Sequence, residues 1–205
     1  MINDLDETIK KIFEKEFPED LMTSTSKSSE KVDISFARPD EQSIAASLSG
    51  NAIGIINFFL YDIEENLEYR TSRSLVQHGQ VENGTGTFTN YPPARINYSY
   101  LVTAWTKADD PLVEHYILSE AIEILMRNLT IPEDVLQGRL IGIKPLPITT
   151  CLHPNKLNPG EFWQAMGGKP RPALNYTVTL DIMAFKDIKL NVVGEDKVVV
   201  KVMSK

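Results

Sequence analysis

The residue types that could bind a metal or attack a substrate are sparse in this chain and stand far apart. Cys151 and His153 form a C-x-H pair, which supplies two ligands, whereas a zinc site needs three or four. The other histidines, His78 and His115, stand far from that pair, in a predicted loop and on a predicted helix face. We therefore predict no metal site, and we interpret Cys151 as a small buried thiol and the histidines as exposed imidazoles.

Motifs for nucleophilic or phosphate chemistry do not occur in the sequence either. No G-x-S-x-G elbow surrounds a serine, and "NGTGTF" at 83–88 differs from the G-x-x-x-x-G-K-[ST] phosphate loop. The carboxylates of "DIEENLE" at 62–68 could serve acid–base chemistry or bind calcium, but they lack a twelve-residue calcium loop. We predict that the protein is not an enzyme and uses no cofactor. A small hydrolase with a non-standard site remains an alternative.

Composition narrows the class of partner. The chain has 205 residues and a net charge of −7, which disfavours nucleic acid and anionic membrane surfaces because both need clustered lysine and arginine. Its longest apolar stretch, 52–61, is about half of the roughly twenty residues that a membrane helix needs. One cysteine rules out an intrachain disulfide, and residues 1–20 do not read as a signal peptide, so we expect folding in a reducing cytosol.

Hydrophobic periodicity predicts an α+β fold with a mixed, mostly antiparallel β-sheet and helices packed against it. Residues 173–185 alternate best, with Leu174, Tyr176, Val178 and Leu180 on the core face and polar residues on the other. Residues 130–133 ("TIPE") have the pattern of a capping box that starts a short helix. Residues 38–51 are interpreted as a loop, and 72–90 as a long loop or a weak hairpin. The predicted strands are 32–36, 53–63, 95–106 and 173–185, followed by a hairpin at 188–202, and the predicted helices are 3–17, 112–128, 131–137 and 159–166.

Three features suit a protein that assembles with others: the glycine-containing segment 72–90, the one-sided polar strand 173–185, and the C-terminal hairpin with exposed edges. Trp163, on a short predicted helix, could anchor a subunit interface or pack in a satellite core. The candidate assembly residues are Arg73, His78, Asn83, Phe88, Trp163, Val198, Val200 and Val202.

Several segments, taken in order, resemble one known family. They are "MINDLDETIKKIFEKEFP", "VDISFARP", "INFFLYDIEENLEYR", "PPARINYSYLVTAWT", "HYILSEAIEILMRN", "IPEDVLQG" and "FWQAMGGKPRPALNYTVTLDI". The chain resembles, over about residues 1–185, the tail-terminator or cap family of phage-tail-like contractile injection systems of the virulence-cassette and antifeeding-prophage type. The segments 21–30 and 72–90, and the residues after 185, do not share the resemblance.

The resemblance implies a structural role in a virulence-type particle. It implies a tail-terminator-like domain at 1–186, and the residue pattern alone adds a C-terminal β-hairpin or arm at 187–205. Six copies would form a hexameric ring on the terminal tube and sheath proteins and stop their polymerisation, without nucleic acid or membrane. Assembly would take place in the bacterial cytoplasm. Whether the protein is then released as part of an extracellular particle is left open. A baseplate, connector or tail-completion subunit is the main alternative.

Two hypotheses locate the assembly contacts. The hairpin 188–202 would provide or cover an open sheet edge that takes part in strand addition. The segment 72–90 would become ordered only against the tube or a neighbour in the ring.

Overall fold

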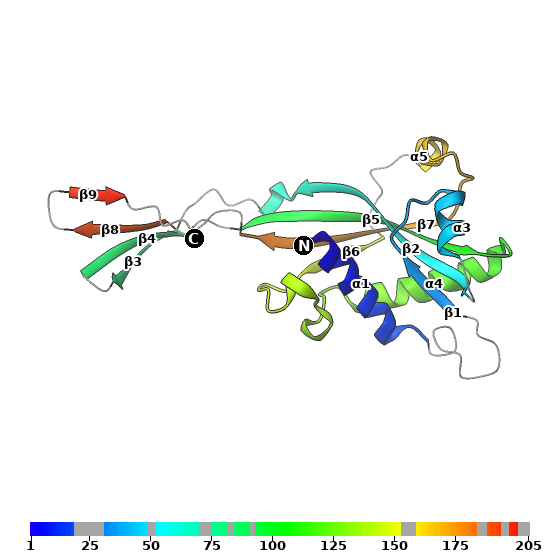
Figure 1. Cartoon of the computed structure of the whole chain (residues 1–205), viewed down its shortest axis with the longest axis horizontal. Helices are drawn as coiled ribbons and strands as arrows, with labels where there is room; N and C mark the ends of the chain where they lie inside the picture. The colour runs from blue at the N-terminus through cyan, green and yellow to red at the C-terminus, as the bar shows by residue number, and fades with distance from the viewer. Residues whose placement is uncertain are drawn as a thin grey trace. The chain divides into compact units, whose positions relative to one another are not determined.

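The computed structural model describes residues 1–18, 31–48, 52–69, 75–81, 84–90, 93–152, 159–183, 188–193 and 197–200. The chain divides into two compact units (Figure 1). The first unit comprises Met1–Glu64 and Asn97–Leu180, and the second comprises Glu65–Ile96 and Asp181–Lys205. The predicted division into 1–186 and 187–205 stays a prediction.

The first unit is built on a five-stranded sheet with the order β1-β2-β5-β7-β6. Its strands are β1 (Lys31–Ser35), β2 (Ala52–Glu65), β5 (Ala94–Thr106), β6 (Ile148–Cys151) and β7 (Ala173–Ile182). β1 runs parallel to β2, and β6 runs antiparallel to β7. Ser99 contacts Thr177 and Asn97 contacts Thr179, so β5 and β7 are also antiparallel. The predicted α+β fold with a mostly antiparallel sheet is confirmed.

Helices α1 (Ile2–Glu16) and α4 (Pro111–Arg127) cover one face of this sheet. The apolar residues of α1 recur at helical spacing and are buried, and the Phe13 ring lies 5.3 Å from that of Phe58 in β2. Gly54 lies four residues before Phe58 in β2, on the same face of the sheet. The absence of a side chain there lets α4 approach closely, because an added Cβ would lie 2.8 Å from Cδ1 of Ile117. The core therefore lies between β2, β5, β7 and these two helices.

Two short helices, α3 (Glu41–Ser47) and α5 (Pro159–Ala165), lie in the first unit away from α1 and α4 (Figure 1). The prediction of a loop at 38–51 was wrong over α3. The side chain of Asp40 accepts a hydrogen bond from the backbone N–H of Ser43 at 2.8 Å, which caps the helix, and Ile44 is buried. The seven residues of α3 are too few to show a helical periodicity in the sequence. The Asp40 cap and the single buried residue, Ile44, are the features that mark the helix.

The helix predicted at 131–137 is also corrected. The chain forms two 3₁₀ turns there, η2 (Glu133–Val135) and η3 (Gly138–Leu140), and no side chain caps the first. Thr130 pairs instead with Ile148 in an isolated antiparallel bridge. The backbone N–H of Thr149, in strand β6, donates to the carbonyl of Leu129, and the sequence analysis did not predict this strand.

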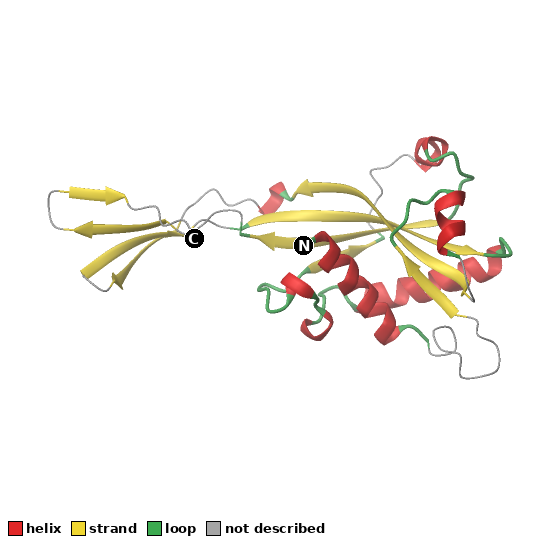
Figure 2. Cartoon of the chain, in the orientation of Figure 1, coloured by secondary structure: helices red, strands yellow, loops and turns green. Residues whose placement is uncertain are grey.

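The second unit contains a four-stranded antiparallel sheet with the order β3-β4-β8-β9 (Figure 2). Its strands are β3 (Leu75–Val81), β4 (Gly84–Asn90), β8 (Ile188–Val193) and β9 (Lys197–Val200), and a 3₁₀ turn, η1 (Leu67–Tyr69), precedes them. The hairpin interpretation of 72–90 is therefore confirmed, as is the C-terminal hairpin. β4 and β8 join the two hairpins by direct pairing, although more than ninety residues separate them in the chain.

Candidate assembly surfaces

The residues that could do chemistry are dispersed through the described structure. Cys151 ends β6, where burial raises the pKa of its thiol. His115 is exposed on α4, His78 belongs to β3, and His153 lies outside the described residues. Within the described ranges, no three His, Cys, Asp or Glu side chains come together as metal ligands.

One face of β7 is polar, as its alternation predicted. Leu174, Tyr176, Val178 and Leu180 are buried, while the odd-numbered residues between them are half-buried. These odd-numbered residues bind side chains of other strands of the sheet: Tyr61 of β2 donates to Asn175 at 2.7 Å, and Thr179 donates to Asn97 of β5 at 2.8 Å. Because the hydroxyl and amide groups hold one another, this surface keeps a fixed hydrogen-bonding pattern. It is suited to a partner that makes polar contacts.

A hydrophobic cluster covers the other end of this sheet face. It consists of Ile44, Trp105 and Trp163, and Phe162 packs against it. Trp163 is only 2% exposed, and its ring centroid lies 6.4 Å from that of Trp105. Trp163 therefore lies in a satellite core, which was one of the two positions considered from the sequence; the other was a subunit interface. Any part that Trp163 plays in an interface would be to position neighbouring residues such as Phe162.

Arg171 fastens the chain between α5 and β7 to this cluster. Its guanidinium carbon lies 4.0 Å from the centre of the Trp105 ring, and its Nη1 donates to Glu114 Oε1 at 2.7 Å. Glu114 is 5% exposed and also accepts from the backbone N–H of Thr106 at 3.3 Å. Arg171 also pairs with Asp109 and lowers the pKa of that carboxyl. Sequence analysis missed this arrangement because its members are dispersed along the chain.

The register of the second unit relates several candidate assembly residues to one another. His78 pairs with Thr87, Thr87 with Leu190, and Leu190 with Val200, which makes one cross-strand row. Phe88 pairs with Gln77 and with Lys189, and Val198 pairs with Val192. Arg73, Asn83 and Val202 lie outside the described residues. Their role in assembly, like that of the others, stays a prediction.

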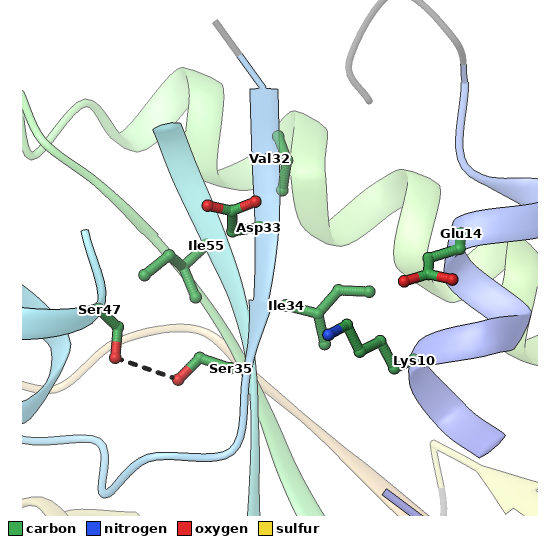
Figure 3. Close-up of a pocket in the computed structure, with 8 residues that line it drawn as sticks. All are labelled: Lys10, Glu14, Val32, Asp33, Ile34, Ser35, Ser47 and Ile55. Atoms are coloured by element: carbon green, nitrogen blue, oxygen red, sulfur yellow. Dashed lines mark hydrogen bonds between the residues drawn. The ribbon is translucent and has the colours of Figure 1, made fainter. Parts of the chain in front are cut away.

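A hollow lies along β1, the strand at one end of the five-stranded sheet (Figure 3). Its volume is about 390 Å³. Figure 3 shows Lys10 and Glu14 of α1 on the side of Val32 and Ile34, with Ser47 of α3 on the other side. Ser35 donates a hydrogen bond to Ser47 at 3.5 Å. The remaining lining residues are Asp33, Ser35 and Ile55.

The opposite end of that sheet is closed by the chain itself. The backbone N–H of Thr149 in β6 donates to the carbonyl of Leu129 at 2.8 Å, and that of Ile131 donates to the carbonyl of Pro147 at 2.9 Å. The two ends of the sheet therefore differ in kind. The strand at 32–36 was predicted from its alternation, but its place at the end of a sheet depends on long-range topology that the sequence pattern does not encode.

The structure of the first unit is an α+β domain built on a five-stranded sheet. A family model for the Pvc16 N-terminal domain matches residues 4–189, and the chain belongs to this family. The family match confirms the resemblance to tail terminators drawn from the sequence. A search among curated proteins gives no significant match.

Two solved structures share the fold. One is described as the sheath/tube terminator, in its extended state, of the extracellular contractile injection system PVC, with a TM-score of 0.59 and 23% identity. The other is the tube-terminating cap of the anti-feeding prophage, with a TM-score of 0.58 and 24% identity. All of the present chain is covered, but only 62% and 61% of those two chains. The likeness establishes a common fold, and the present chain spans about three fifths of each structure.

None of the helices in the described ranges combines the length and apolar character that crossing a membrane requires.

Proposed function

We propose that this protein is a structural cap of a contractile injection system. In this proposal, six copies form a ring that ends the inner tube and its sheath and stops their growth. The observation that carries the proposal is the family match over residues 4–189, supported by a fold shared over the whole chain with two terminators. The protein acts by binding and performs no reaction, it is assembled in the cytoplasm, and it leaves the cell only within the particle.

The physics of a growing tube explains what such a cap must do. A helical polymer grows because each layer presents a surface that the next layer matches, a heterologous contact that does not close. A terminator has to match that surface on one side and to present nothing that a further layer can use on the other. An α+β domain with one fixed polar sheet face and one sheet end closed by its own chain has the asymmetry that this task needs.

A baseplate, connector or tail-completion subunit of the same kind of particle is the main competing function. These proteins face the same assembly problem, so composition and surface chemistry do not separate them from a cap. The two terminators that share the fold favour the cap. A labelled copy of the protein would lie at the end away from the baseplate if it is a cap.

The direct test is the length distribution of particles by electron microscopy, from the native gene cluster with and without this gene. We expect overlong, uncapped or unstable tube–sheath particles without it, and normal length when the gene is supplied again on a plasmid. Particles of normal length with an intact end in the deletion strain would refute the cap, and a baseplate or accessory role would take its place.

A further inference from the structure

We draw no further inference here: the strongest candidate, the hollow along the edge strand β1 between α1 and α3, carries none, because nothing in the described part of the chain shows what covers it.

Discussion

Arg171 contributes to the first unit through several contacts made by one side chain. It stacks on Trp105 and pairs with Glu114, which is almost fully buried. Removing the cation leaves a buried carboxylate without its partner, a change that typically costs several kcal/mol. The cluster therefore depends on arginine in particular, since lysine has neither the planar fork nor the stacking surface.

Arg171→Ala should lower the free energy of unfolding by about 3 kcal/mol, because Glu114 loses its partner while it stays buried. Arg171→Lys, which keeps the charge, should lose less. Urea unfolding followed by circular dichroism measures both variants. A loss below about 1 kcal/mol for Arg171→Ala would mean that solvent or another group takes over the pairing.

Asp6 gives a pH dependence of known sign. Tyr100 donates to its Oδ1 at 2.8 Å, and burial raises the carboxyl pKa above the ordinary value of 3.8. A raised pKa in the folded state means that the protonated form contributes stability. That stability is fully present below pH 3.8 and is lost as pH rises through the folded-state pKa.

Asp6→Asn should remove this loss, because asparagine accepts the same hydrogen bond without a charge. Relative to wild type, the variant should therefore become more stable as pH rises from below 3.8 toward neutrality. Thermal melts of both proteins across that range measure the difference. A difference that stays constant with pH, or that falls, would show that the Asp6 pKa is not raised.

At the scale of elements, the contact between β2 and α4 is closer than ordinary side chains permit. A Cβ on Gly54 would lie 2.8 Å from Cδ1 of Ile117 and 2.9 Å from the backbone oxygen of Trp105. The second neighbour is backbone, which has little freedom to move. This pair of elements therefore requires glycine at position 54 of β2.

Gly54→Ala should lower the free energy of unfolding by about 1–3 kcal/mol through overpacking. Gly168→Ala is the matched control, because its nearest contact, Cε3 of Trp163, would be at an ordinary 3.5 Å. Denaturant melts of both variants make the comparison. Equal stability of the two variants would mean that α4 can shift away from β2 at little cost.

The sequence predicts long elements well where one pattern decides them. The alternation of β7 assigned its two faces, and the predicted helices 3–17 and 112–128 correspond to α1 and α4. It predicts short elements poorly, because their state depends on partners elsewhere. Thr130 fits a capping box but pairs with Ile148, and α3 is defined by one cap and one buried residue.

At the scale of the whole molecule, the four-stranded sheet joins two segments whose pairing no sequence pattern predicts. β4, from the glycine-containing segment, pairs directly with β8 of the C-terminal hairpin. The two hypotheses about assembly therefore concern one structural unit. The candidate residues His78, Val198 and Val200 could be named from the sequence, but the strand pairing that brings β3 and β9 into one sheet follows only from the register.

Deleting 187–205 and replacing 72–90 with a short Gly-Ser turn should therefore give the same defect, weak capping with a folded first unit. Each change removes one of the two hairpins that make up the sheet. Electron microscopy would count capped particles, and circular dichroism would verify that the first unit is folded. Normal capping by either variant would show that the four-stranded sheet is dispensable.

The location of both tryptophans has a practical consequence. Trp105 and Trp163 lie in one cluster of the first unit, and no tryptophan occurs in 65–96 or 181–205. The intrinsic fluorescence of the protein is therefore a local probe. Its emission wavelength and its quenching report on the surroundings of Arg171 and α5. Changes confined to the second unit do not alter this fluorescence. A tryptophan placed in β3 or β8 would give that unit a signal of its own, so that the two units could be observed separately while the particle assembles.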